Sequence, residues 1–271
     1  MVAFDRKGLD LSRPEIIDDR LLPIEFDVVI NAAAATSVDY CEKHPEEATQ
    51  VNADGPARVA EICARRGAKM VQISTDYVYD GSGEGLKSEE SATRPLGVYA
   101  ATKLAAENAV LSASPRHLVL RTAWVFGPDR QSFVDSILEK AAASDLVQAI
   151  DDKFASPTYS NDFGAHLEAL LRLQQCGIFN LSNDGICSWW QFARTALDIA
   201  IKMGLPLKAT SIQRQKLASM TTFLAPRPVY TAMSLDKLER ATGHRPRSWE
   251  SALADYLETF YSTTADSGTK P

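Results

Sequence analysis

Short apolar runs alternate with helical patterns along the first half of this 271-residue chain. The runs cover residues 27–31, 69–74 and 117–121, are rich in β-branched side chains, and each ends in a polar residue. Helical patterns at residues 45–66 and 99–112 lie between and after them. Nearly continuous apolar strands joined by helices are typical of a parallel sheet covered on both faces. The sequence therefore predicts an α/β fold with a Rossmann-like, doubly wound parallel sheet and right-handed crossovers.

The pattern changes after about residue 145. A loop-rich stretch spans residues 148–158, a short strand is predicted at 177–182, and helices are predicted at 161–174, 188–203, 234–239 and 249–261. Ser188 is a suitable N-cap, because its side chain can accept a backbone N–H of the first turn. We expect a Rossmann-like domain over 1–146, a smaller α/β region over 147–261 that returns elements to the sheet, and a disordered tail over 262–271.

Tyr99 and Lys103 are the pair of residues most suited to acid–base chemistry. They are four residues apart in Tyr99-Ala-Ala-Thr-Lys103, so a helix places them on one face. A phenol with its usual pKa of about 10 is a poor acid–base group at neutral pH, and a neighbouring ammonium lowers that pKa. Such a pair suits proton transfer to a carbonyl oxygen during hydride transfer. The same spacing also occurs by chance on ordinary surface helices.

Polar residues follow two of the predicted strands. Residues 74–77, Ser-Thr-Asp-Tyr, end one strand, and Asn31-Ala-Ala-Ala-Ala-Thr36 ends another. The carboxyl ends of parallel strands are where α/β proteins bind ligands, and the Thr75 hydroxyl could bond the same carbonyl oxygen as Tyr99. The small alanines would let a cofactor approach the backbone. The alternative is that these residues only cap their own strand ends and turns.

The charge balance excludes several classes of function. Lys and Arg total 29 against 35 Asp and Glu, a net charge of −6, whereas nucleic acids and anionic membranes call for a basic surface. The sequence has no apolar run of membrane-spanning length and does not begin like a signal peptide. Its four cysteines and four histidines have no metal-ligand or disulfide spacing. We expect a cytoplasmic protein with no metal site and no nucleic acid or membrane partner.

Taken in order, these motifs resemble the extended short-chain dehydrogenase/reductases, and among them the dTDP-4-dehydrorhamnose reductase family. The resemblance extends to about residue 260, through Leu9-Asp-Leu-Ser12, residues 27–39, Val51-Asn52, residues 74–79, 95–103 and 121–126, and Ala225-Pro-Arg-Pro228. It implies reduction of a nucleotide-linked 4-keto sugar, dTDP-4-dehydro-L-rhamnose, with NADPH or NADH. It also implies that the region from 147 to 261 binds the sugar nucleotide, and it leaves a homodimer open.

The resemblance assigns roles to individual residues. Tyr99 would donate the proton to the sugar ketone, Lys103 would hold the nicotinamide ribose and tune Tyr99, and Thr75 would complete the catalytic trio. Besides Tyr99 and Lys103, the implied cofactor-binding residues are Asp5, Arg6, Asp10, Leu11, Asn31, Ala32, Ala33 and Asn52. The implied substrate-binding residues are Thr36, Asp76, Tyr77, Arg121, Trp124 and Arg227.

The glycine-rich phosphate loop of this superfamily, G-x-x-G-x-x-G, does not occur in the sequence. The cluster Gly81-Ser-Gly-Glu-Gly85 opens no predicted helix, and we interpret it as a flexible loop beside the sugar pocket. Residues 2–12 resemble the part of the family that follows its first βα unit of roughly 30 residues. Asp5 would then end a strand and bond the adenosine ribose, with Arg6 beside it for a 2′-phosphate. If the protein begins at Met1, we expect weak nicotinamide binding and an exposed apolar gap in the sheet.

Two other functions stay open from the sequence. A non-catalytic sugar-nucleotide-binding or regulatory protein would need no phosphate loop, and another sugar-nucleotide enzyme such as an epimerase would keep Thr75, Tyr99 and Lys103. Sugar-nucleotide dehydratases differ more, since they carry Asp-Glu after the threonine where this chain has Asp76-Tyr77. Elimination needs both carboxyl groups, so the sequence favours ketone reduction over dehydration.

Overall fold

The centre of the computed structural model, which describes residues 1–262, is a four-stranded parallel sheet ordered β1-β2-β3-β8. Its strands are β1 (Val28–Asn31), β2 (Lys69–Thr75), β3 (Leu118–Thr122) and β8 (Gly177–Asn180). In this register Val71 lies opposite Leu118, which in turn lies opposite Gly177. The predicted α/β class and all four predicted strands of this sheet are confirmed.

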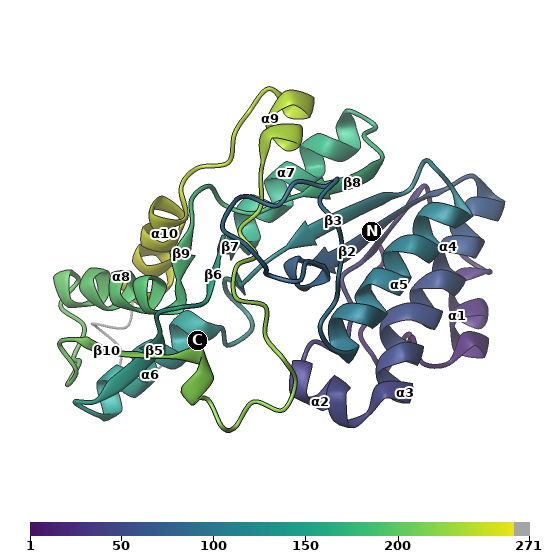
Figure 1. The fold of residues 1–271 in the computed structure, drawn as a ribbon. Coiled ribbons are helices and arrows are strands. Elements are labelled where there is room, and N and C mark those ends of the chain that lie inside the picture. Colours follow the sequence, from purple (N-terminus) through teal and green to yellow (C-terminus); the bar gives the residue numbers. More distant parts are fainter. Residues whose placement is uncertain (263–271) are drawn as a thin grey trace.

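Helices cover both faces of the sheet (Figure 1). One face carries α1 (Pro14–Leu21), α4 (Gly55–Arg66) and α5 (Val98–Ala113), whose apolar side chains share one buried cluster with β2 and β3. The other face carries α7 (Ser160–Arg172) and α9 (Asp236–Thr242), which share a second cluster with β2, β3 and β8. Burial on both faces is the reason that the strands are apolar along their whole length.

The remaining elements form a second lobe, which lies to the left in Figure 1. Here α6 (Phe133–Ala143), α8 (Trp189–Lys202) and α10 (Trp249–Tyr261) pack beside the parallel pair β5 (Val147–Ile150) and β10 (Ile212–Gln215). The predicted N-cap of α8 is confirmed, because the side chain of Ser188 accepts the backbone N–H of Gln191 in a capping box.

Four two-residue strands lie at the start of the second lobe, in two pairs. β4 (Val125–Phe126) is parallel to β7 (Thr158–Tyr159), and β6 (Phe154–Ala155) is antiparallel to β9 (Cys187–Ser188). The segment after β10 holds a short 3₁₀ turn at Leu217–Ser219 and then runs back toward the sheet. These pairings bring residues 124–126, 153–159 and 187–189 together near the carboxyl end of β3.

The helical stretch predicted over residues 45–66 is confirmed in its bounds, but one turn of it is not α-helical. It consists of α3 (Pro45–Thr49), a π-helical turn at Gln50–Asp54 and α4, and the separate short helix α2 (Val38–Lys43) precedes it. The π turn holds Asn52 fully buried, and Gly55 after it lies so close to Leu11 that an added Cβ would sit 2.3 Å from the Leu11 carbonyl oxygen. The wider turn therefore lies where the helix packs against residues far away in the sequence.

The N-terminal residues do not form the strand that the sequence suggested. Residues 1–5 have no regular structure, and the Asp5 carbonyl oxygen accepts the N–H groups of Gly8 and Leu9, so Asp5 starts a turn instead of ending a strand. Within residues 1–262, β1 lies at an edge of the sheet, where Val28 and Ile30 are 39% and 49% exposed.

Two further expectations concern the ends and surface of the chain. The predicted disordered tail, 262–271, lies outside the described residues except for Ser262. Within residues 1–262, each helix is too short or too polar to cross a membrane. The same residues contain no group of three or more His, Cys, Asp or Glu side chains arranged to hold a metal ion.

Candidate active site

The three candidate catalytic residues come together where β2 ends beside the start of α5. Thr75 is the last residue of β2, Tyr99 is the second residue of α5, and Lys103 follows one helical turn later. Thr75 and Lys103 are 6% and 3% exposed, and the Tyr99 hydroxyl interacts with the Thr75 hydroxyl. The fold therefore places a hydroxyl, a phenol and an ammonium at one end of the sheet.

Burial raises the pKa of Tyr99 to about 12, and the hydrogen bond with Thr75 only partly opposes this effect. The expected lowering of this pKa is therefore wrong in this structure, because desolvation of the phenolate outweighs its stabilisation. A phenol with such a pKa holds its proton throughout the neutral range. That state suits a group that must deliver a proton to a developing alkoxide.

The Lys103 side chain contacts the backbone of β2. Its Nζ donates a hydrogen bond of 2.6 Å to the Ile73 carbonyl oxygen. Burial lowers the pKa of Lys103 to about 8, and the negative charge of Glu107 opposes that shift. The ammonium form thus persists at neutral pH, while the predicted tuning of Tyr99 by Lys103 stays a prediction.

Asp76 adds a carboxyl group to the polar side chains at the end of β2. It begins the 3₁₀ turn Asp76–Val78, is 2% exposed, and accepts a hydrogen bond of 3.2 Å from the Thr75 Oγ1. The Thr231 hydroxyl donates to its second oxygen. Burial raises the pKa of Asp76, and the nearby charge of Lys153 opposes this rise. The Asp76 carboxyl group is therefore hydrogen-bonded directly to the Thr75 hydroxyl.

Tyr77 forms one wall of the site. Its ring meets the Tyr99 ring edge-on with centroids 6.0 Å apart, and burial raises its phenol pKa. It also lines a narrow hollow whose other lining residues are Val38, Leu96, Gly97, Ala100, Pro226 and Pro228. The fold thus brings together three segments that carry the family resemblance and are far apart in the sequence, those around Tyr77, Tyr99 and Pro226.

Trp124 has an unusual backbone. Its φ is +45°, in the left-handed region that a bulky side chain rarely adopts, and such strain often marks a functional position. Its ring lies against Trp189 and Phe192, with centroids 5.7 and 6.5 Å away. Within residues 1–262, its Nε1 is buried without a hydrogen-bond partner. The predicted contact of Trp124 with the substrate stays a prediction.

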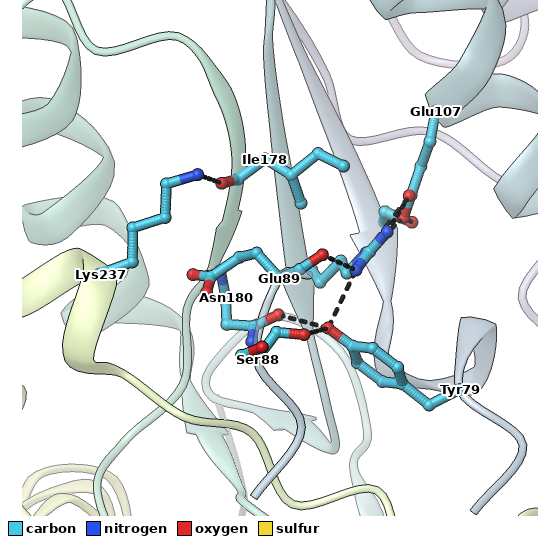
Figure 2. A network of polar contacts seen from close by, with 9 residues as sticks. Tyr79, Ser88, Glu89, Glu107, Ile178, Asn180 and Lys237 are labelled. Atoms are coloured by element: carbon cyan, nitrogen blue, oxygen red, sulfur yellow. Dashed lines mark hydrogen bonds and ion pairs between the residues drawn. The ribbon is translucent and has the colours of Figure 1, made fainter. Parts of the chain in front are cut away.

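The prediction that Arg121 contacts the substrate is wrong in this structure. Its side chain is 3% exposed and forms a 2.6 Å ion pair with Glu107 of α5, and it also donates to the Tyr79 hydroxyl and the Glu89 carbonyl oxygen (Figure 2). The guanidinium is satisfied inside the sheet–helix layer, because burial of an arginine requires a partner for its charge. The side chain of Arg121 is thus committed to the interior of the fold.

Arg227 and Thr36 lie at the other predicted end of the sugar nucleotide. Arg227 forms a 2.8 Å ion pair with Asp39 at the start of α2, and Asp39 also accepts the backbone N–H groups of Leu224 and Ala225. This contact ties the segment after β10 to the Rossmann-like part. Thr36 is exposed, so it is accessible to a ligand. Nucleotide contacts by Arg227 and Thr36 stay predictions.

Among the predicted cofactor-binding residues, two are placed differently from expectation. The side chain of Leu11 is 6% exposed and packs into the core under α4. Asn52 is fully buried and bonds both backbone groups of Ala35 through its own amide, at 2.8 and 3.0 Å. The Leu11 side chain therefore packs the core and Asn52 shapes the loop after β1, while their predicted places beside a cofactor stay predictions.

The other predicted residues leave room for a dinucleotide. Ala32 and Ala33 are exposed just after β1, and Asn31 accepts the N–H of Ala33 while donating to Gln72. A hollow of about 550 Å³ near the N-terminus is lined by Asp5, Arg6, Lys7, Asp10, Arg13, Ile16 and Arg20. Four basic side chains suit the phosphates of an adenine dinucleotide. The residues present fit the two ends of NAD(P)H, at Lys103 and at this hollow.

Sequence reasoning missed Lys153, Glu107 and Thr231. Glu107 follows Lys103 by four residues on the same helix face, which was a readable signal. Lys153 follows two aspartates in a loop-rich stretch and looks like part of a solvated turn, yet it is fully buried. For Lys153 and Thr231 the sequence held no comparable signal.

A hydroxyl, a phenol and an ammonium at the carboxyl edge of a parallel sheet are typical of the extended short-chain dehydrogenase/reductases, and the likeness to solved reductases places this chain in that class of oxidoreductases. The family can be stated as well. A profile of the RmlD substrate binding domain matches residues 1–262, so the chain belongs to that family.

Individual relatives agree with this assignment. The dTDP-4-dehydrorhamnose reductase of Mycobacterium tuberculosis (strain ATCC 25618 / H37Rv) is 39% identical over 242 residues, which cover 85% of this chain and 76% of that protein. The solved structure of a dTDP-4-dehydrorhamnose reductase from Clostridium acetobutylicum ATCC 824 has a TM-score of 0.90 at 30% identity, covering 96% of this chain and 90% of that one. That of the Bacillus anthracis enzyme in complex with NADP has a TM-score of 0.89 at 28% identity, covering 94% and 89%. The predicted family is confirmed.

Proposed function

We propose that this chain reduces the keto group of dTDP-4-dehydro-L-rhamnose to give dTDP-L-rhamnose, with NAD(P)H as the reductant. The observation that carries the proposal is the placement of the partly buried Tyr99 phenol, at the start of α5, beside Thr75 at the end of β2, with Lys103 one helical turn further on. The names of the relatives support the substrate, and the B. anthracis complex supports NADP(H). The acidic Asp76-Tyr77 sequence, with one carboxyl group in place of two, also favours reduction.

In this proposal, the residues of the chain act on the ketone oxygen. The Thr75 hydroxyl orients that oxygen by a hydrogen bond, and Tyr99 delivers the proton that turns it into an alcohol. NAD(P)H supplies the hydride. Lys103, the exposed Ala32 and Ala33, and the basic hollow around Arg6 would hold the cofactor.

The second lobe would bind the sugar nucleotide. Its Lys153 ammonium lies among the rings of Tyr77, Trp124 and Trp189, and Tyr77 contacts Tyr99. The division into a Rossmann-like domain over 1–146 and a substrate region over 147–261 is part of this proposal. The homodimer stays a prediction. Thr75, Tyr99 and Lys103 of a single chain come together without residues from a second copy, so their arrangement does not call for a dimer.

The decisive variant is Tyr99→Phe. Loss of the phenol oxygen removes the proton donor, so kcat should fall by about 10²–10⁴-fold while the affinity for the sugar nucleotide changes little. Oxidation of NADPH measures turnover, and calorimetry measures affinity. Tyr40→Phe is the matched control, because Tyr40 is an exposed tyrosine that bonds Glu47 on α3. Turnover of Tyr99→Phe at the wild-type rate would contradict the proposal.

The second candidate that the sequence left open is a non-catalytic sugar-nucleotide-binding or regulatory protein of the same fold. Calorimetry separates the two. Binding of dTDP without measurable NADPH binding supports the binding protein. Tight binding of NADPH together with NADPH oxidation in the presence of the keto sugar supports the reductase.

A further inference from the structure

The helix that carries Tyr99 is capped by a side chain of another helix. The N-cap position of α5 is Gly97, so no side chain is present there to accept an N–H group. The first N–H groups of a helix need partners from outside, because no preceding turn offers them a carbonyl oxygen. Glu42 of α2 provides such a partner, since its Oε2 accepts the Val98 N–H at 3.0 Å. A carboxylate at this end of a helix is also favoured by the helix dipole.

Gly97 leaves the space that this contact needs. A Cβ added to Gly97 would lie 3.0 Å from Glu42 Oε2 and 3.5 Å from Pro226 Cδ. The backbone of Gly97 is extended, with φ −146° and ψ 176°, a conformation that any residue adopts. The close approach of the Glu42 carboxylate, and not the backbone conformation, is therefore the reason that a glycine fits here.

The helix α2 is itself fixed by contacts with two other segments. The Cys41 Sγ donates to the Ala35 carbonyl oxygen in the loop after β1, at 3.3 Å. Asp39 pairs with Arg227 at 2.8 Å and accepts two backbone N–H groups of the segment after β10. Glu42 therefore reaches α5 from an element that is anchored on both sides.

The capped turn carries the proposed proton donor. Tyr99 directly follows Val98, whereas Lys103 lies one turn further into the helix. Helix ends fray, so loss of the cap should displace Tyr99 more than Lys103. Proton transfer needs donor and acceptor about 2.6–3.2 Å apart, and a misplacement of about 1 Å can cost about 10²-fold in rate. The position of the Tyr99 phenol thus depends on how firmly the first turn of α5 is held.

We propose that Glu42 is a positioning residue of the reductase: its carboxylate caps α5 at Val98 and holds the first turn, and Tyr99 with it, beside the end of β2. This inference rests on the proposed function and deepens it. The short helix α2 then has a task in turnover, although neither Glu42 nor its neighbours on α2 donate a proton to the ketone.

The test removes the hydrogen-bond acceptor or keeps it. In Glu42→Ala the acceptor is gone, and kcat of the folded protein should fall about tenfold while the KM for the keto sugar stays close to the wild-type value. The solvent deuterium isotope effect on kcat should rise in this variant, because proton delivery becomes slower relative to the other steps. Glu42→Gln should keep most of the wild-type kcat, since its amide oxygen can still accept the Val98 N–H.

The matched control is Ser248→Ala. Ser248 caps α10, where its side chain accepts the Ser251 N–H at 3.2 Å. This variant also loses a helix cap and a comparable amount of stability, which circular dichroism measures. Its kcat and its solvent isotope effect should stay unchanged.

A second measurement does not depend on turnover. Nitrogen-15 NMR follows the hydrogen exchange of the Val98 amide, which should speed up in Glu42→Ala and stay unchanged in Ser248→Ala. If Glu42→Ala does not fold, Gly97→Ala replaces it, because the added methyl group presses on the Glu42 carboxylate without removing it. Gly97→Ala should lower kcat and speed up exchange of the Val98 amide in the same direction.

The outcomes are distinguishable. A wild-type kcat and isotope effect in folded Glu42→Ala would overturn the positioning role. An equal fall of kcat in Glu42→Ala and Ser248→Ala would also overturn it, because general loss of stability would then explain both. A wild-type chain without turnover of the keto sugar would contradict the proposed function, while the exchange of the Val98 amide would still decide whether Glu42 caps α5.

Discussion

Two buried charge clusters lie on either side of the candidate catalytic residues and differ in how well they are paired. Arg121 and Glu107 form a direct 2.6 Å ion pair with side chains 3% and 1% exposed, inside the sheet–helix layer (Figure 2). Lys153 has a carbonyl oxygen and aromatic rings as its contacts, with Asp76 as its counter-charge. A fully paired cluster holds elements together, whereas the less completely paired one contains a lysine whose pKa burial lowers to about 8.

The position of the Arg121–Glu107 pair explains its structural role. Glu107 follows Lys103 by one turn of α5, accepts the Ser74 hydroxyl, and is bonded by Arg121 of β3. These contacts fix the helix that carries Tyr99 to the strand that ends in Thr75. The cluster therefore sets the distance between catalytic groups without touching the ligand side.

The largest effect should follow from breaking the paired cluster. Arg121→Met leaves the Glu107 carboxylate buried without its partner, which should lower the free energy of unfolding by about 3–5 kcal/mol. Urea unfolding followed by circular dichroism measures this loss. The double variant Arg121→Met/Glu107→Leu should recover most of it, since no buried charge is then left unpaired. A loss below about 1 kcal/mol in the single variant would mean that the pair does not stabilise the layer.

The pH dependence of stability should reveal the lysines with lowered pKa values. Burial lowers the pKa values of Lys103 and Lys153 from 10.5 to about 8. Between pH 8 and pH 10.5, these two lysines therefore bind more protons in the unfolded chain than in the folded one. These two lysines should therefore contribute a rise in the free energy of unfolding from pH 8 to 10, of about 2 kcal/mol each, whereas groups with raised pKa values, such as the Cys63 thiol, contribute in the opposite direction. Unfolding experiments at pH 8, 9 and 10 test this.

The same pH experiment distinguishes the two clusters. Lys153→Gln should lose its share of the rise, about half, whereas the Arg121→Met/Glu107→Leu double variant should keep the share of Lys153. An equal slope in wild type and Lys153→Gln would show that Lys153 keeps an ordinary pKa in the folded protein.

The smallest effect is expected at the contact between the two parts of the chain. Arg227 is nearly buried, but its partner Asp39 is 33% exposed, so Arg227→Ala should cost only about 1 kcal/mol of stability. The KM for the sugar nucleotide should rise more clearly, because the segment after β10 loses its anchor on α2. Arg214→Ala is a suitable control, since Arg214 lies 3.9 Å from Asp151 and is 64% exposed. An unchanged KM in Arg227→Ala would separate this anchor from substrate binding.

Sequence reasoning recovered the sheet and the common location of Thr75, Tyr99 and Lys103, because both leave local patterns. β-Branched runs predicted β1, β2 and β3, and the spacing of Tyr99 and Lys103 placed them on one helix face. It failed for Arg121. This residue lies near the carboxyl end of β3, where α/β proteins bind ligands, so a substrate contact was expected. The ion pair with Glu107 on the neighbouring helix α5 was not foreseen. Sequence reasoning gave the bounds of the helical 45–66 segment but not its π turn at Gln50–Asp54, which lies where Asn52 is buried and Gly55 packs against Leu11.

The sequence by itself determined the order of strands and helices, the alternation that buries a parallel sheet on both faces, and the residues able to move a proton. The tertiary structure alone decided which charges are desolvated and by what they are neutralised. Lys153 follows two aspartates and would be solvated in an isolated turn, yet contacts with Tyr77, Trp124 and Pro228 bury it. The physical reason is that desolvation and charge pairing depend on distances between segments far apart in the chain, which no local pattern specifies.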